Sequence, residues 1–295
     1  MLSARSPPPS RDDYPSTTVL SHCIWPYESG EVVVQSYNTL LTLSALLDAA
    51  DAVLLVQNEA LAAAATLQMH IPRPSFDDLN AIASRNLVSA LLPACWRSAS
   101  GGGGAAPPRM PGSLLCETVG RLCSHPQLRL LSLLSVPQMP AKNVDFTTFS
   151  WPAQLKRLRQ MALTGTSLEE GLRWSLSPDT RTARCVAASL TLRGKGADCA
   201  DASSLADRSL YASWAPEPLS VSFSPQRLTS YEMTATLLAN SSAAAWPAER
   251  ALQRAHAMLS SRAYLHQYAE HGLEMEHFEA AFARVGDAVA SYHVL

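Results

Sequence analysis

Charged side chains are scarce in this sequence, and neither sign dominates. They make up 16% of the 295 residues, with 23 Lys and Arg against 25 Asp and Glu, which gives a net charge of −2. Because nucleic-acid-binding proteins usually carry a basic surplus, this balance argues against a nucleic-acid partner. No apolar run approaches the roughly 18 residues that a membrane-spanning helix needs, so we expect no membrane partner. The first ten residues contain no apolar stretch, and we therefore expect no secretory signal.

Motifs of several common sites are also missing. The sequence contains no G-x-G-x-x-G after an expected strand, no G-x-x-x-x-G-K-[ST], no H-E-x-x-H and no G-x-S-x-G. Nucleotide phosphates are usually cradled by a glycine-rich turn or a helix N-terminus, and we identify no such cradle. The six cysteines form no C-x-x-C pair, which favours reduced thiols over a disulfide scaffold or a zinc site. We therefore predict no metal site.

Apolar periodicity in the first hundred residues predicts an α/β unit. Residues 1–20 are rich in Pro, Ser and Asp, a composition that favours disorder. The elements expected next are a strand at 32–34, a helix at 38–50, a strand at 52–56, a helix at 59–67 with Asn58 as its N-cap, and a helix at 76–92. Strand, helix, strand, helix implies parallel strands joined by crossover helices.

The rest of the chain mixes element types and ends in helices. Residues 98–112 are rich in Gly and Pro, and because they follow an expected helix rather than a strand, they are interpreted as a surface insertion. Strands are expected at 128–136, 187–192, 219–223 and 233–238, and helices at 151–163, 245–262 and 275–289. The fold class predicted from these patterns is α/β.

Polar and aromatic residues gather where this unit should bind a ligand. Such units bind in the crevice at the carboxyl ends of their strands. Glu31 and Gln35 flank the first expected strand and could hydrogen-bond a sugar hydroxyl, and Asn58 follows the second. Phe76 and Asn80 lie one turn apart at the start of the long helix. A ring for stacking and two amides suit a purine base; the alternative is that the amides only cap or decorate helices and the ring belongs to the core.

Several segments resemble the tubulin superfamily. Residues 32–64 contain Tyr37-Asn38 and Asn58-Glu59, and residues 75–80 follow at the family's spacing, with Phe76 where tubulins usually have Tyr. Within the superfamily the likeness is greatest to the delta subfamily. The segments that carry it are 24–27, 147–151, 158–161, 192–195, 210–214, 263–268 and 289–292.

The resemblance implies a tubulin fold: an incomplete Rossmann-like GTPase domain, a core helix, a mixed α/β intermediate domain and a C-terminal helical hairpin. The implied division is a disordered N-terminus (1–20), the C-terminal half of the nucleotide-binding domain (21–75), the core helix (76–97), the insertion (98–112), the intermediate domain (113–228) and a C-terminal strand with helices (229–295). The family's phosphate loop would lie upstream, so the sequence looks like a delta-tubulin without its N-terminal third. We expect the chain to be poorly stable alone and to bind GTP weakly or not at all, because a divided sheet exposes unpaired edges.

The resemblance also implies residue roles. Asn58 and Asn80 would recognise guanine, Phe76 would stack on it, and Glu31 and Gln35 would lie near the ribose. Glu117 falls about where polymerising tubulins carry an acidic residue that activates water on the neighbouring subunit's GTP; an ordinary loop carboxylate is the alternative. The implied cofactor is GTP, with Mg²⁺ in full-length members of the family.

The implied function is that of a delta-tubulin-like cytoskeletal GTP-binding protein involved in centriole and cilium assembly. Its expected partners are other tubulins and centriolar or basal-body proteins, with residues 140–149 as a lateral contact loop. The expected locations are the cytoplasm, cytoskeleton, centriole or basal body, cilium and nucleus. The alternative is a truncated interaction module that binds no nucleotide.

Overall fold

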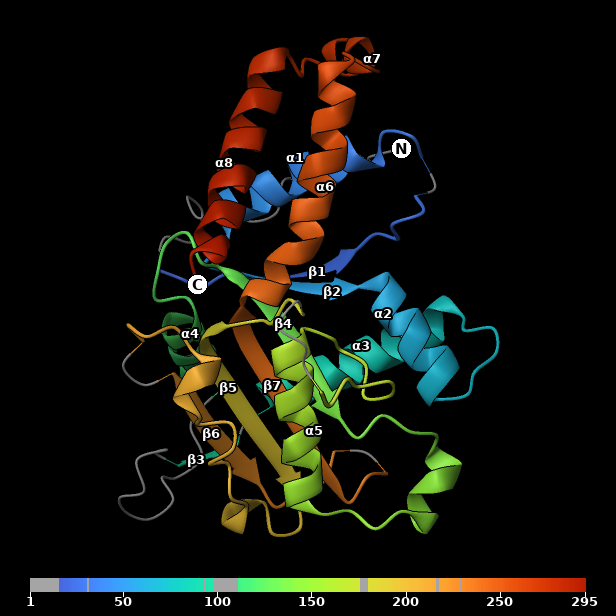
Figure 1. Ribbon diagram of the computed structural model, residues 1–295, viewed down its shortest axis with the longest axis vertical. Helices are drawn as coiled ribbons and strands as arrows, with labels where there is room; N and C mark the ends of the chain where they lie inside the picture. The colour runs from blue at the N-terminus through green and yellow to red at the C-terminus, as the bar shows by residue number, and fades with distance from the viewer. Residues whose placement is uncertain are drawn as a thin grey trace.

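One mixed sheet runs through the part of the chain that the computed structural model describes, residues 16–30, 32–92, 94–97, 111–175, 180–215, 218–228 and 230–295 (Figure 1). Its strands are β1 (Leu20–Trp25), β2 (Ala52–Gln57), β3 (Cys95–Arg97), β4 (Leu130–Val136), β5 (Cys185–Gly194), β6 (Leu219–Ser224) and β7 (Met233–Ser241). Their spatial order is β1-β2-β4-β7-β5-β6-β3. The β1, β2 and β4 strands are parallel, whereas β7 runs antiparallel to both of its neighbours. The α/β class predicted from the sequence is therefore confirmed.

Helices cover both faces of this sheet and extend beyond one end of it. They are α1 (Gln35–Ala49), α2 (Asn58–Ala63) with a π-helical turn (Ala64–Gln68), α3 (Phe76–Leu91), α4 (Pro111–Leu122), α5 (Trp151–Thr164), α6 (Ser242–Ser260), α7 (Leu265–Ala269) and α8 (Met275–His293). Short 3₁₀ turns occupy Ala141–Phe146, Ala197–Cys199 and Arg208–Leu210. In Figure 1, α6 and α8 stand side by side above the sheet, and α1 packs against both. None of the described helices is long and apolar enough to cross a membrane.

The α3 and α5 helices lie on opposite faces of the sheet. Ser89 of α3 hydrogen-bonds Thr236 of β7 at 2.8 Å between the two hydroxyls. Leu155 of α5 instead belongs to the same buried cluster as Leu237, the next residue along β7. Because successive residues of a strand point to opposite faces, the two contacts assign the two helices to different sides.

The first strand of the parallel unit is not where the sequence pattern put it. The predicted strand at 32–34 is wrong: Val32 and Val33 are 55% and 69% exposed in the turn before α1. The strand is Leu20–Trp25, which pairs with β2 along its whole length. Six residues can form that ladder, whereas a three-residue apolar run is too short to distinguish a strand from a helix lead-in. The predicted strand-helix-strand-helix order with parallel pairing is nevertheless confirmed.

Most other predicted elements are confirmed with shifted ends, and three details differ. Asn58 is not an N-cap: it is the first residue of α2, and Gln57 with extended backbone precedes it as the cap. The short strand β3 and the helices α4 and α7 were not predicted. Leu20, predicted to end a disordered segment, begins β1. Residues 1–15, and residues 98–110 of the predicted insertion, lie outside the described part of the chain.

A buried tyrosine ties the last helix to the middle of the sheet. The Tyr292 hydroxyl of α8 accepts a hydrogen bond from the Leu130 backbone N–H at 2.8 Å and lies 2.7 Å from the Asn240 side-chain oxygen. The Asn240 amide nitrogen donates to the Leu122 and Leu128 carbonyls at 2.8 and 2.6 Å. These bonds satisfy polar groups that are closed off from water, where an unpaired one would be destabilising.

Candidate functional site

The carboxyl ends of β1 and β2 meet at one edge of the sheet. The two strands are in register to their last residues, with Trp25 opposite Gln57. The loop at 26–30 leaves β1 there, and α2 leaves β2 directly, since Asn58 is already helical. In open parallel α/β sheets, ligands bind in the crevice outside these carboxyl ends. We therefore expect a ligand site at this edge of the sheet.

Phe76, Asn80 and Asn58 lie on the first turns of two helices that pack together. Phe76 is the first residue of α3 and is 71% exposed, and Asn80 one turn later is also exposed. Leu61 and Leu79, each one turn into α2 and α3, share one buried cluster. The start of α3 is fixed by a capping box, in which the backbone N–H of Ser75 donates to the Asp78 carboxylate at 2.8 Å.

The amides and the ring of this group remain available to a ligand. Within the described residues, no protein group hydrogen-bonds the side-chain amide of Asn58 or Asn80. The Phe76 ring is not core, because most of its surface is open. An exposed ring and two amides on adjacent helix starts can stack on a planar base and hydrogen-bond its edge.

The other predicted site residues lie in different settings. Gln35 is the first residue of α1, and its side-chain amide donates to the Tyr27 carbonyl at 2.5 Å. Glu31 lies outside the described part of the chain. Glu117 lies on α4 rather than in a loop, and it forms an i, i+4 ion pair with Arg121 at 3.2 Å. The structure thus groups Asn58, Phe76 and Asn80 on packed helices and puts Glu117 on a separate one.

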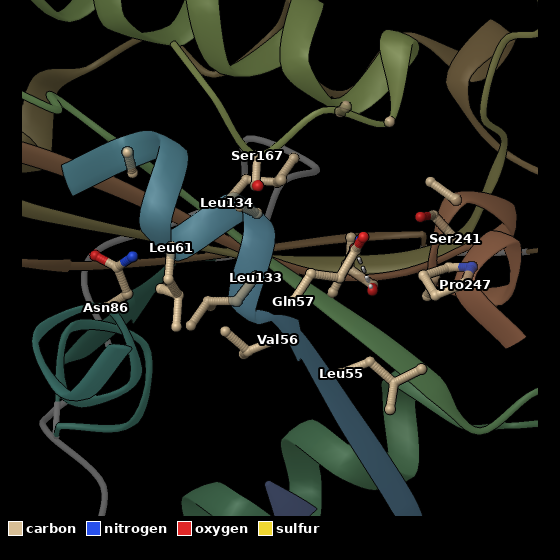
Figure 2. A pocket seen from close by; sticks show the side chains of 18 of the residues that line it. Leu55, Val56, Gln57, Leu61, Asn86, Leu133, Leu134, Ser167, Ser241 and Pro247 are labelled. Carbon is tan, nitrogen blue, oxygen red and sulfur yellow. Dashed lines mark hydrogen bonds between the residues drawn. The ribbon is translucent and has the colours of Figure 1, made fainter. Parts of the chain in front are cut away.

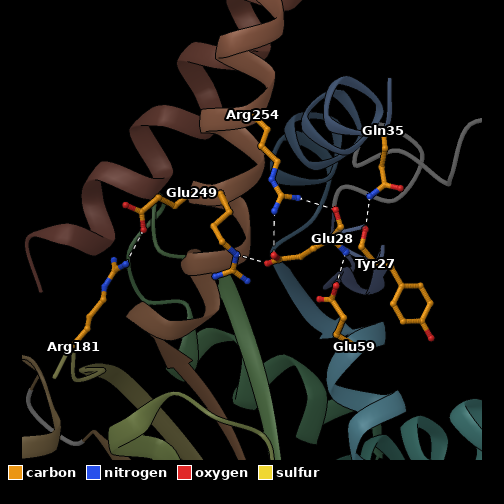
Figure 3. Close-up of polar contacts among 8 residues, drawn as sticks. Tyr27, Glu28, Gln35, Glu59, Arg181, Glu249 and Arg254 are labelled. Atoms are coloured by element: carbon orange, nitrogen blue, oxygen red, sulfur yellow. Dashed lines mark hydrogen bonds and ion pairs between the residues drawn. The ribbon is translucent and has the colours of Figure 1, made fainter. Parts of the chain in front are cut away.

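The loop at 26–30 carries site features that the sequence did not reveal (Figure 3). The Glu28 carboxylate is bound by Arg250 and Arg254 of α6, the second at 3.1 Å. The Glu28 backbone N–H donates to Glu59 of α2 at 2.5 Å. More than 220 residues separate Glu28 from the two arginines, so no local pattern could have paired them. The i, i+4 spacing of the arginines is the one available signal, and it also fits a solvated helix face.

Electrostatics favour the charged form of Glu28. Partial burial alone would raise the pKa of this carboxyl, but the charges and hydrogen bonds of Arg250 and Arg254 outweigh it and hold the pKa below its ordinary value. A carboxylate that is charged at neutral pH and bound by two guanidinium groups makes strong charge-assisted hydrogen bonds. The loop is therefore anchored to α6 under ordinary conditions.

A cavity lies next to this edge, and residues of α2, α3, β2 and β4 contribute to its lining (Figure 2). Its lining is mostly apolar, including Leu61, Ile82 and Leu133, with Gln57 and Asn86 among its polar members. The cavity has a volume of about 70 Å³. Pockets for drug-sized ligands measure about 300–1,000 Å³, so this one suits a few water molecules rather than a nucleotide. A nucleotide base at the sheet edge would have to bind outside it. Among the described residues, no group of three or more His, Cys, Asp or Glu side chains could hold a metal ion.

The chain is 33% identical over 300 aligned positions, 96% of its length, to the tubulin delta chains of Macaca fascicularis and Mus musculus. Over nearly its whole length the chain is therefore similar to tubulins of the delta type. It is also 27% identical to the tubulin beta-2 chain of Suillus bovinus over 96% of its own length. No protein-family model matches the chain.

This similarity confirms the resemblance that the sequence segments indicated, and with it a tubulin-like α/β fold. The chain spans 64% of the length of the delta chains and 60% of the length of the beta-2 chain. The aligned length includes the sheet edge with Asn58, Phe76 and Asn80, since it takes in nearly all of the 295 residues.

Proposed function

We propose that this chain is a delta-tubulin-type cytoskeletal subunit that recognises a guanine nucleotide at the carboxyl edge of β1 and β2. It works with other tubulins and with centriolar and basal-body proteins in centriole and cilium assembly. The observation that carries the proposal is the 33% identity to tubulin delta chains across 96% of this chain. The proposal divides the chain as the family is divided, with residues 21–75 in the nucleotide-binding domain and α3 in the core helix.

Base recognition falls to three residues in this proposal. Phe76 stacks on the guanine ring, for which its 71% exposed side chain is available. Asn58 and Asn80 hydrogen-bond the edge of the base, because an amide carries both a donor and an acceptor and guanine presents both. Glu31 and Gln35 lie near the ribose. GTP is the proposed nucleotide; Mg²⁺ accompanies it in full-length members of the family.

Glu117 has a separate role, in a neighbouring subunit's reaction. Its carboxylate orients a water molecule, or accepts a proton from it, as the water oxygen attacks the γ-phosphorus of GTP and GDP leaves. The placement of Glu117 on α4, with side-chain exposure of 33%, makes it accessible to a neighbour. Hydrolysis therefore requires a second subunit that presents its nucleotide to this helix.

Titration of the purified chain with fluorescent GTP tests the proposed base recognition. The sequence contains no glycine-rich phosphate loop, so we expect contacts only to the base and ribose and a dissociation constant on the order of 1 mM. GTP, GDP and guanosine should then compete about equally, without a requirement for Mg²⁺, and adenosine should not compete. Micromolar binding that requires Mg²⁺ would show that the chain holds the phosphates, contrary to this expectation.

Matched variants then assign the contacts. Asn80→Ala and Phe76→Ala should each weaken guanosine binding, while Asp77→Ala on the same first turn should not. Equal binding by the Asn80 and Phe76 variants and the wild type would contradict the assigned roles.

The cellular part of the proposal needs a different test. We expect the tagged chain to concentrate at centrioles or basal bodies during their assembly. Diffuse staining without a centriolar focus would contradict that role.

One observation favours a second function, an interaction module that binds no nucleotide. The Gln35 amide, proposed to face the ribose, donates to the Tyr27 carbonyl within the loop. The two functions differ in the titration: an interaction module binds neither guanosine nor GTP but still concentrates at centrioles.

A further inference from the structure

The loop at 26–30, which follows β1, is held against α6, a helix from a distant part of the chain. Arg250 and Arg254 lie one turn apart on α6, and both bind the Glu28 carboxylate (Figure 3). Arg254 also donates to the Glu28 backbone carbonyl at 3.0 Å. A side chain and a main-chain group of one residue are therefore bound by the same helix.

The same loop is held on its other side by the sheet edge. The Glu28 backbone N–H donates to the Glu59 carboxylate at 2.5 Å, and Glu59 directly follows Asn58 on α2. The Tyr27 carbonyl accepts from Gln35 at the start of α1. Gly30 then closes the turn with a φ of +57°, a left-handed conformation that favours glycine. Among the described residues, the hydrogen bonds and ion pairs of Glu28 thus reach either α6 or the start of α2.

We propose that Arg250 and Arg254 are positioning residues for the guanine-nucleotide site, acting through Glu28 on the loop and on the start of α2. This inference rests on the proposed function and deepens it: α6 regulates the nucleotide edge. Coupling between two sites is reciprocal. A nucleotide that orders the loop therefore strengthens its attachment to α6, and a partner that occupies the arginines weakens nucleotide binding.

The charges around the loop favour a local effect over a global one. The side chains of Arg250 and Arg254 are 42% and 47% exposed, and ion pairs at such exposure contribute little to overall stability. The three hydrogen bonds that these arginines donate to Glu28 nevertheless restrict where the loop at 26–30 can lie. Removing them should therefore loosen the loop while leaving the unfolding transition almost unchanged.

Hydrogen exchange of the purified full chain tests the link without any nucleotide. Arg254→Gln changes a residue far from the loop in sequence, so the intrinsic exchange rates of the loop amides stay the same. We expect the protection factors of the Glu28 and Gly30 amides to fall about tenfold in Arg254→Gln. Glu28→Gln should lower that of Gly30 similarly, and the double variant should lose little more than either single variant.

A matched control lies on the same helix. Glu249, next to Arg250, pairs with Arg181 at 2.9 Å and with His293 at 3.2 Å, and neither partner lies on the loop at 26–30. Glu249→Gln should leave loop exchange within twofold of the wild type. Loop protection unchanged in Arg254→Gln, or lowered equally in Glu249→Gln, would overturn the proposal.

Binding of fluorescent GTP is the second readout, and it distinguishes the positioning role of the arginines from the proposed nucleotide binding itself. Arg254→Gln should bind it about tenfold more weakly at an unchanged urea midpoint, and Arg254→Lys, which keeps one donor and the charge, should recover part of the loss. Equal binding by Arg254→Gln and the wild type would overturn the positioning role while leaving the proposed function intact. No binding by the wild type would overturn the proposed function and the role of the arginines toward a nucleotide, while exchange would still report whether α6 holds the loop.

Discussion

Replacing Arg193 by Met should loosen the C-terminal end of α3. Arg193 lies on β5, and its side chain is 4% exposed. Its Nε donates to the Ser89 carbonyl at 2.9 Å, and its terminal nitrogen donates to the Leu92 carbonyl at 2.5 Å. The residue four positions after Ser89 is Pro93, which has no N–H to offer that carbonyl. The guanidinium therefore supplies a donor that the helix itself cannot provide.

The expected loss of stability follows from these two bonds. Hydrogen bonds to charged groups contribute roughly 1.5–3 kcal/mol each, which gives a gross figure of about 3–6 kcal/mol. Burial of the guanidinium, which lowers the pKa of Arg193, offsets part of this because the charge loses hydration. A positive charge at a helix C-terminus adds a favourable contribution of a few tenths of a kcal/mol or more. We expect Arg193→Met to lower the unfolding free energy by about 2–4 kcal/mol, or Tm by roughly 5–10 °C.

Urea and thermal unfolding of the purified chain measure this loss. Arg227→Met, a change at an exposed arginine, is the control and should stay within about 0.5 kcal/mol of the wild type. Arg193→Lys should recover only part of the loss, because one ammonium cannot reach both carbonyls in the geometry of the guanidinium fork. A change below about 0.5 kcal/mol in Arg193→Met would refute the idea that this residue caps α3.

Three other changes test a close backbone contact, a buried hydrogen bond and a carboxylate with a lowered pKa. Gly194→Ala adds a Cβ 1.9 Å from the Glu232 carbonyl oxygen at a φ of +121°, and we expect it to lower the unfolding free energy by about 2–4 kcal/mol in urea titrations. Tyr292→Phe leaves the Asn240 side-chain oxygen without its buried partner and should cost about 1–3 kcal/mol in the same assay. The hydrogen bond from the Ser209 backbone N–H, the largest cause, and the hydrogen bond from Arg159, the next, lower the pKa of Asp207 from 3.8 to about 2. The stabilisation from this folded-state shift is present above pH 4 and lost as pH falls through 2, so Asp207→Asn should flatten the stability profile between those values; an unchanged slope would contradict it.

Local patterns predicted most of the helices and the fold class but misplaced the first strand. The long helices have apolar periodicity over four or more turns, which identifies α3 and α8 from their residues alone. The β1 strand is short and follows a Pro- and Ser-rich stretch, so its pairing partner in β2 identifies it more than its own composition does. The apolar run at Val32 was more hydrophobic but had no partner to pair with. Strand assignment depended on a contact that periodicity does not record.

The candidate site likewise contains some residues that could be predicted from the sequence and others that could not. Asn58 and Phe76 could be selected because each begins a helix, and Asn80 because it lies one turn after Phe76, positions that are visible in one sequence. Glu28 and Arg254 could not, since an ion pair between residues 226 positions apart depends on where the sheet brings α6. The commitment of Gln35 to the loop was equally hidden, because a side-chain amide can reach either a ligand or its own backbone.

The anchor formed by Tyr292 bears on how the chain completes its fold during synthesis. The Leu130 backbone N–H lies in the middle of the sheet, yet its hydrogen-bond acceptor is Tyr292 in the last turn of α8. A nascent chain that has emerged only as far as β7 therefore holds this donor, and the Asn240 oxygen, without a partner inside a closing core. These groups of the central strands therefore have their native hydrogen bonds only when the last turn of α8 is packed against the sheet.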